Sequence, residues 1–189
     1  SEQVTIDGEA ITVTGVAKGS GMIKPNMATM LAYIACDATV SEEVLQRSVV
    51  EIANASFNRI TVDGDTSTND CFMLCASGAS ALSPIVSVED PRLLYLEDTI
   101  ASVAKTLAQS IVRDGEGATK FVTVTVSGGA SRTECLEVGY TVAESPLVKT
   151  ALFAGDANWG RFCMAIGRAQ IEGLDAAGVS LYLDKVEVA

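Results

Sequence analysis

Short apolar runs, separated by glycine and aspartate, dominate the first 80 residues of the chain. Residues 4–6 and 10–14 flank Asp7-Gly8, a pair that favours a tight two-residue turn, so they predict a β-hairpin. Small residues at 15–21 then predict a loop. The apolar run at 29–36 is short and ends at an aspartate, which predicts a buried strand.

Helical spacing of apolar residues begins after Ser41, which is a good N-cap and precedes two glutamates that suit the positive end of a helix dipole. Asp90-Pro91 supplies the cap and the first residue of a second helix with a long apolar stripe. A third helix is predicted from Ser145-Pro146 to about Phe153, and a further helical turn or two after Trp159.

The rest of the chain contains shorter runs and breaks. Further elements are expected as a short strand at 60–62, a polar loop at 63–70, a buried strand at 71–76, a surface loop at 77–88, a cleanly alternating strand at 121–126, and a closing hairpin of 179–183 with 186–188. Because strands and helices alternate irregularly, the pattern predicts a layered α/β or α+β sandwich.

The charge balance narrows the class of protein. A formal net charge of −11 argues against nucleic acid and anionic membrane surfaces as partners, since both attract clustered Lys and Arg. No run approaches the roughly 18 apolar residues of a membrane span, and no signal peptide is recognisable, so a soluble protein is expected. The absence of histidine excludes Ser-His-Asp and Cys-His triads within the chain.

No metal site is expected. The five cysteines include no CxxC pair, and without histidine a zinc site would need thiolates and carboxylates alone, so we interpret them as buried reduced thiols of a cytosolic protein. Asp63-Gly64-Asp65 resembles the start of a calcium loop only superficially. Thr68 stands where that loop needs glycine, and Leu74 stands where it needs glutamate.

The segment from Lys18 to Leu31 carries the strongest candidate chemistry. A flexible glycine loop follows Lys18, Pro25 fixes the approach, and the small Ala28 precedes Thr29 at the head of the apolar run. Thr29 can attack the carbonyl before it, and cleavage between Ala28 and Thr29 would give Thr29 a free α-amine. With an unperturbed pKa of about 7.7–8.0, that amine can act as general base for the threonine's own hydroxyl.

This segment has two other interpretations. In the simpler one, Thr29 is an ordinary strand residue, and Gly19 and Gly21 form an ordinary turn. A phosphate-binding loop is disfavoured because the segment has neither GxGxxG spacing nor the Lys-Ser/Thr pair of a P-loop.

Five blocks, in the same order, resemble the ornithine acetyltransferases, the ArgJ family of arginine biosynthesis. They span most of the chain, which makes the match far more specific than one short motif. The blocks are residues 15–31, 62–70, 114–120, 145–151 and 156–161.

The resemblance implies a precursor that cuts itself between Ala28 and Thr29. Thr29 would be the catalytic nucleophile, taking acetyl from N-acetylornithine and passing it to glutamate in a ping-pong reaction; some members also use acetyl-CoA. Lys18 and Glu116 match the family's substrate-binding residues, together with Thr29. No cofactor is implied, and the expected compartment is the bacterial cytoplasm, although fungal relatives are mitochondrial.

The charges of Lys18 and Glu116 also suit the roles that the resemblance implies for them. Lys18 is a cation on a mobile loop that could hold a substrate carboxylate, the plainer alternative being a solvated surface lysine. Glu116 lies in a glycine-flanked loop and could bind the ornithine ammonium group or assist proton transfer, the alternative being an ordinary loop carboxylate. Residues 63–70 are interpreted as a hydrogen-bonded turn lining the same pocket.

The resemblance also implies fold and organisation. It implies an α/β (α+β) sandwich of sheets between helices, the DmpA/ornithine acetyltransferase fold, like the N-terminal-nucleophile hydrolases but differently connected. Residues 1–28 would end the upstream α-chain segment, and 29–189 would form the nucleophile-bearing β-chain domain, truncated at its C-terminus, in an α/β hetero-oligomer. Upstream Thr-Gly oxyanion donors and a C-terminal Asn and Ser or Thr are expected from segments beyond this chain, which alone should be a poor catalyst.

Two alternatives keep the residues but change the function. The same threonine chemistry could act on another substrate, as in self-cleaving aminopeptidases or acyltransferases of secondary metabolism. The chain could instead be a non-catalytic fragment that only packs against its partner segments.

Overall fold

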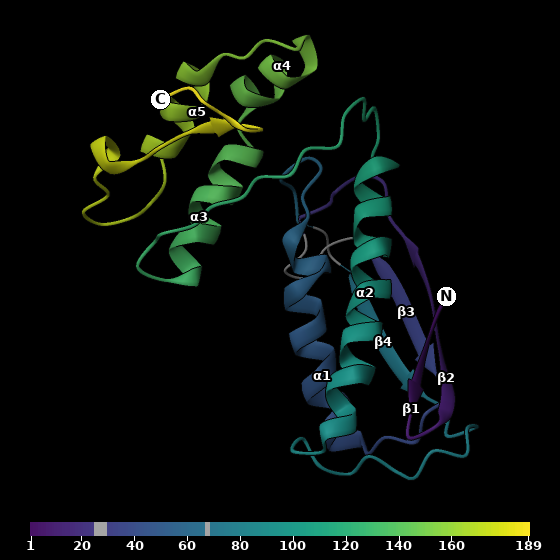
Figure 1. The fold of residues 1–189 in the computed structure, drawn as a ribbon. Coiled ribbons are helices and arrows are strands. Elements are labelled where there is room, and N and C mark those ends of the chain that lie inside the picture. The colour runs from purple at the N-terminus through teal and green to yellow at the C-terminus, as the bar shows by residue number, and fades with distance from the viewer. Residues whose placement is uncertain (25–29, 67–68) are drawn as a thin grey trace. The chain divides into compact units, whose positions relative to one another are not determined.

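The computed structural model describes residues 1–24, 30–66 and 69–189 (Figure 1). Two compact units divide the chain, Ser1–Ala118 and Thr119–Ala189.

The first unit begins with the expected hairpin. Strands β1 (Glu2–Ile6) and β2 (Glu9–Lys18) pair antiparallel, and Asp7 and Gly8 between them have φ angles of 52° and 85°. Two positive φ angles are what the favoured two-residue hairpin turn requires, which is why Asp-Gly is selected there. The hairpin prediction is confirmed.

Strand β2 runs further than the sequence indicated. Its second half pairs antiparallel with β3 (Leu31–Cys36), ending in the pair Lys18–Leu31. The predicted loop at 15–21 is therefore wrong for 15–18, because pairing with β3 overrides the weak strand preference of small residues. The predicted strand at 29–36 is confirmed over the described residues 31–36.

The sheet has the order β1-β2-β3-β4, and β4 (Cys71–Ala76) runs parallel to β3. A parallel pair needs a crossover, which α1 (Glu42–Ala55) supplies after its predicted N-cap Ser41. The strand at 71–76 is confirmed, but none of its residues is fully buried, and among the described residues β4 pairs only with β3. Its Cys75 is exposed, which corrects the expectation of buried thiols; all five cysteines are free.

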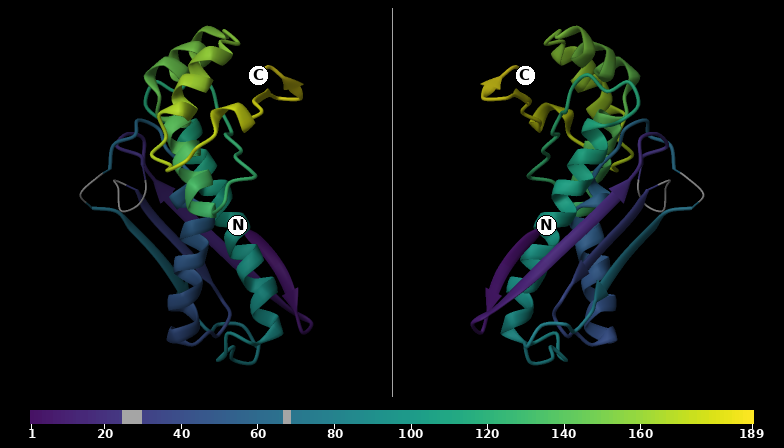
Figure 2. Two further views of the ribbon diagram at one scale, coloured as in Figure 1. Left: turned by 90° about the vertical axis from the view of Figure 1, so that its left-hand side faces the viewer. Right: turned by 90° about the vertical axis from the view of Figure 1, so that its right-hand side faces the viewer.

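Helix α2 (Pro91–Arg113) lies beside α1 on one face of the sheet (Figure 1), and Figure 2 shows the same layers from two sides. On β3, Ala32, Ile34 and Cys36 point to the helices and are buried, whereas Tyr33 on the other face is exposed. Helix α2 turns one stripe to this core, comprising Leu93, Leu96, Ile100, Val103, Ala104, Ala108 and Ile111.

Two further expectations in the first unit need correction. Residues 60–62 follow a short 3₁₀ turn, η1 (Phe57–Arg59), and form no strand; Val62 N–H donates to the Ile23 carbonyl at 2.7 Å. The loop at 77–88 is not wholly on the surface. Leu82 and Ile85 are buried, and a bridge between Val40 and Ile85 fixes the loop to the core.

The second unit is a small helical cluster. It contains α3 (Arg132–Ala143), α4 (Pro146–Ala154), α5 (Trp159–Gly167) and a 3₁₀ turn, η2 (Ala176–Gly178). A short hairpin of β5 (Tyr182–Leu183) and β6 (Val186–Glu187) follows. The predicted third helix and the turns after Trp159 are confirmed, and the closing hairpin is confirmed over 182–183 and 186–187. Helix α3 lies outside every helix predicted from the sequence.

The strand predicted at 121–126 is wrong, because these residues pair with no strand in the described part of the chain. Alternating Val and Thr suit a pleated surface, but a strand exists only where a partner completes its hydrogen bonds.

None of the helices over residues 1–24, 30–66 and 69–189 has the length and apolar character needed to cross a bilayer.

Candidate functional site

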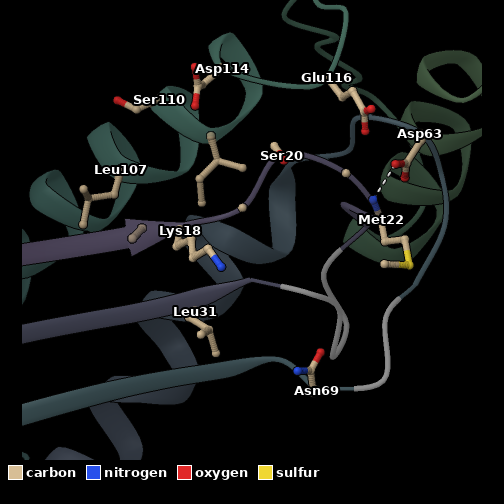
Figure 3. A pocket seen from close by; sticks show the side chains of 14 residues that line it. Lys18, Ser20, Met22, Leu31, Asp63, Asn69, Leu107, Ser110, Asp114 and Glu116 are labelled. Atoms are coloured by element: carbon tan, nitrogen blue, oxygen red, sulfur yellow. Dashed lines mark hydrogen bonds between the residues drawn. The ribbon is translucent and has the colours of Figure 1, made fainter.

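A pocket of about 960 Å³ opens in the first unit where the end of β2 meets the end of α2 (Figure 3). One wall comes from the end of β2 and from residues 19–23 after it, which we call the glycine loop. The other walls come from α2 and the loop after it, and from β3 and the 63–70 loop. The lining residues are Ala17, Lys18, Gly19, Ser20, Gly21, Met22, Leu31, Asp63, Asn69, Leu107, Ser110, Ile111, Asp114 and Glu116.

Lys18 reaches this pocket because it is the last residue of β2. Its strand partner is Leu31, the first residue of β3, and both line the pocket. Lys18 is exposed, and in Figure 3 its ammonium group extends below the glycine loop. The substrate-binding role of Lys18 remains a prediction.

Glu116 enters the pocket from the loop that follows α2. Its main-chain N–H donates to the Ser20 carbonyl at 2.8 Å, which joins this loop to the glycine loop. A methyl group on Gly21 would lie 3.1 Å from Glu116 Oε2, so the absence of a side chain at 21 leaves room for the carboxylate. The structure thus brings Lys18 and Glu116, 98 positions apart by their numbering, to one pocket.

Asp63 ties the 63–70 loop to the glycine loop. Its Oδ2 accepts from Met22 N–H at 2.5 Å, and its Oδ1 accepts from the N–H groups of Ile23 and Asp65, each at 3.0 Å. Burial alone would raise the pKa of Asp63, but these N–H donors outweigh it and hold the pKa below its ordinary value. The sequence indicated a hydrogen-bonded turn here, but not that its first carboxylate accepts from residues 41 and 40 positions earlier.

Asp70 makes a similar contact at the other end of the loop. Its Oδ1 accepts from Met30 N–H at 2.5 Å, and Cys71 N–H donates to the Met30 carbonyl at 3.0 Å. Burial raises the pKa of the Asp70 carboxyl, and the Met30 N–H only partly offsets this. Its Oδ2 is buried and has no hydrogen-bond partner among the described residues.

The predicted nucleophile Thr29 and the predicted cleavage site Ala28–Thr29 lie outside the described residues. Among the charged groups that line the pocket are one ammonium, from Lys18, and the carboxylates of Asp63, Asp114 and Glu116. This combination suits a ligand that carries both charges, such as an amino acid. Over the described ranges, no three Cys, Asp or Glu side chains gather as they would to hold a metal ion.

The model of the ArgJ family matches residues 1–189, so the chain belongs to the ArgJ family. The resemblance found in the sequence is thereby confirmed.

Relatives with high sequence identity support the same family assignment. The chain is 58% identical over 189 residues to the "Arginine biosynthesis bifunctional protein ArgJ" of Pseudomonas fluorescens (strain Pf0-1), covering 100% of this chain and 47% of that protein. The protein of the same name from Pseudomonas syringae pv. tomato is 56% identical over 189 residues, with the same coverage. The chain therefore spans about half the length of these curated relatives.

A crystal structure is also similar. It is that of the "Arginine biosynthesis bifunctional protein argJ" from Bacillus halodurans, with a TM-score of 0.68 and 43% sequence identity. The match covers 72% of this chain and 63% of that one. The predicted α/β class is confirmed by this match and by the mixed sheet and helices described above.

Proposed function

We propose that this chain is the nucleophile-bearing part of an acetyltransferase of arginine biosynthesis. Its membership of the ArgJ family supports the proposal, as do the printed names of the relatives. The observation that carries it is that Lys18 and Glu116, oppositely charged and far apart in sequence, line one pocket whose wall includes Leu31, two residues after Thr29.

The proposed reaction has two acyl transfers. Thr29 Oγ1 attacks the acetyl carbonyl of N-acetylornithine while the α-amine of Thr29 accepts the hydroxyl proton. The amide C–N bond breaks, and the proton passes to the departing ornithine nitrogen, which leaves an acetyl ester on Thr29. The amine of glutamate then attacks that ester, and N-acetylglutamate leaves as the threonine hydroxyl is restored.

The charges of Lys18 and Glu116 suit the substrates of this reaction. Lys18 would pair with a substrate carboxylate, which both N-acetylornithine and glutamate carry. Glu116 would pair with the side-chain ammonium of ornithine, which glutamate lacks. Because N-acetylglutamate would place a second carboxylate near Glu116, this wall of the pocket would favour N-acetylornithine over N-acetylglutamate as the acetyl donor of the first half-reaction.

The proposal includes self-cleavage between Ala28 and Thr29, with residues 1–28 ending the upstream chain and 29–189 belonging to the downstream chain. The ladder between β2 and β3, from Val13–Cys36 to Lys18–Leu31, supports this division. A cut at that position leaves those main-chain hydrogen bonds intact, so the two products would remain one folded body. The oxyanion donors and the closing substrate residues would come from segments beyond this chain, and a cytoplasmic location is part of the same proposal.

The full-length protein tests these steps. Intact-mass analysis should find two chains that meet at Ala28/Thr29, and after incubation with N-acetylornithine an acetyl adduct on the chain that begins with Thr29. Thr29→Ala should abolish cleavage and acetyl transfer, whereas Thr29→Ser, which keeps a hydroxyl, should retain part of both. A Thr29→Ala protein that still transfers acetyl would contradict the mechanism, and release of amino acids from amides instead of acetyl transfer would favour an aminopeptidase.

A further inference from the structure

Asp63 accepts hydrogen bonds from main-chain N–H groups of the glycine loop. Its Oδ2 accepts from Met22 N–H at 2.5 Å, and its Oδ1 accepts from Ile23 N–H at 3.0 Å, so one carboxylate holds two consecutive N–H groups of a segment that belongs to no strand. With Asp65 N–H also bound to Oδ1, three of its roughly four lone-pair sites are occupied. That leaves Asp63 little capacity to hold a ligand itself.

The segment that Asp63 holds is conformationally unfavourable. Met22 has a φ of 52°, in the left-handed region that residues with a long side chain seldom adopt. Such a conformation persists where the surroundings fix it from several sides. Here the fixing contacts are the two N–H bonds to Asp63 and the bond from Val62 N–H to the Ile23 carbonyl at 2.7 Å.

The same segment forms the wall between the two predicted substrate-binding charges. Gly21, next to Met22, faces Glu116, whose Oε2 would lie 3.1 Å from a methyl group at 21; Asp63 Oδ2 would lie 3.8 Å from that point. Lys18 begins the wall at the end of β2, and Figure 3 shows Asp63 and Met22 joined at one end of the pocket. A change in the backbone conformation of residues 20–23 would therefore change the shape of the pocket beside Glu116.

We propose that Asp63 is a positioning residue for this pocket: its ionised carboxylate fixes residues 20–23 so that Glu116 and Lys18 face one substrate. The proposal rests on the proposed function of the two charges. It requires both carboxylate oxygens as acceptors. Asparagine would turn an NH₂ donor toward N–H donors at one of the two oxygens, although its size is nearly the same.

The test uses the full-length protein and four forms, wild type, Asp63→Asn, Asp63→Glu and Asp65→Asn. Asp65→Asn is the matched control because Asp65 is exposed, carries the same charge in the same loop, and does not line the pocket. Asp63→Glu keeps the charge but moves it by one methylene group. Asp63→Asn and Asp63→Glu should each raise KM for N-acetylornithine about tenfold or more, with a smaller fall in kcat, because charge-assisted hydrogen bonds position the binding groups. Asp65→Asn should stay within twofold of wild type.

A second measurement does not depend on activity. Peptide-resolved hydrogen exchange should show faster exchange at residues 20–24 in Asp63→Asn, with unchanged protection in β3 around Ile34. Unchanged exchange at 20–24, a KM for Asp63→Asn within twofold of wild type, or an equal loss in Asp65→Asn would overturn the proposal. If wild-type protein transfers no acetyl, the proposed function fails, while the exchange experiment still decides whether Asp63 holds the loop.

Discussion

The main-chain N–H of Glu116 donates a 2.8 Å hydrogen bond to the main-chain carbonyl oxygen of Ser20. This bond joins the loop after α2 to the glycine loop after β2, and it uses no side-chain atom. The position of the Glu116 backbone is therefore independent of its carboxylate, which is exposed at the pocket. A substitution at Glu116 should test binding chemistry without disturbing the loop.

Glu116→Gln should weaken substrate binding while leaving the fold intact. The glutamine keeps the size and the Ser20 contact but loses the negative charge that would pair with a substrate ammonium group. Since hydrogen bonds to charged groups contribute about 1.5–3 kcal/mol, KM for N-acetylornithine should rise roughly ten- to hundredfold in the full-length enzyme. Steady-state kinetics check this, with Glu89→Gln as control, because Glu89 is exposed and is not among the residues that line the pocket. An unchanged KM would contradict the role given to Glu116.

Local patterns predicted most of the first unit but not its contacts. The Asp7-Gly8 turn and the Asp90-Pro91 helix start depend on adjacent residues, so the sequence contains the whole signal. The Asp63–Met22 bond joins positions 41 apart and depends on how two loops meet. The pattern of apolar and polar residues contains no signal for such a contact. Lys18 and Glu116 were predicted as site residues through the family resemblance.

The second unit shows two different causes of error. The strand expected at 121–126 has the right alternation but no pairing strand among the described residues, and sheet structure is a property of pairs. Helix α3 is the opposite case, because the sequence does contain a local signal for the start of this helix. Ser131 Oγ accepts from Glu134 N–H at 3.2 Å, and Glu134 Oε2 accepts from Ala130 N–H at 2.9 Å, a variant of the Ser-x-x-Glu capping box.

Leu96→Ala should destabilise the first unit strongly, whereas Leu94→Ala should not. Both residues lie on α2, but Leu96 is 1% exposed in the core and Leu94 is 61% exposed. Truncating a buried leucine costs about 2–5 kcal/mol, from lost burial and from the cavity left behind. The exposed substitution should change the free energy of unfolding by less than about 0.5 kcal/mol. Urea denaturation measures both, and equal effects would show that the stripe of α2 is assigned to the wrong face.

Gly15→Ala should destabilise the contact between β2 and α2. A methyl group at 15 would lie 2.8 Å from Leu107 Cδ1 and 3.0 Å from Val103 Cγ1, both inside the normal contact distance. Overpacking of this kind costs about 1–3 kcal/mol. Because Leu107 also lines the pocket, a rise in KM should accompany the loss of stability. Gly167→Ala is the matched control, since no atom outside its own helix lies within 4 Å of an added methyl group there. Wild-type stability of Gly15→Ala would contradict the packing described.

Asp90 stabilises the start of α2 through two kinds of contact. Its Oδ1 accepts from Arg92 N–H at 3.0 Å as the helix cap, and its Oδ2 lies 2.6 Å from Arg92 Nη2. Arg92 also donates to the carbonyls of Ser83 and Pro84, so the pair ties the preceding loop to the helix start. The Arg92 side chain first, and then the Arg92 N–H, lower the pKa of Asp90 from 3.8 to about 2.

This lowered pKa predicts a specific pH dependence for Asp90→Asn. Because the carboxylate is held below its ordinary pKa in the folded state, its stabilising effect is complete above about pH 4 and is lost as the pH falls toward 2. Asparagine can still cap the helix but cannot pair with Arg92 as an ion. The variant should therefore have a lower Tm than wild type at pH 6, and the difference should shrink between pH 4 and pH 2. Thermal denaturation across that range checks this, with the exposed Asp98→Asn on the same helix as control. A Tm difference that persists unchanged at pH 2 would mean that asparagine destabilises the helix start for a reason other than the lost charge.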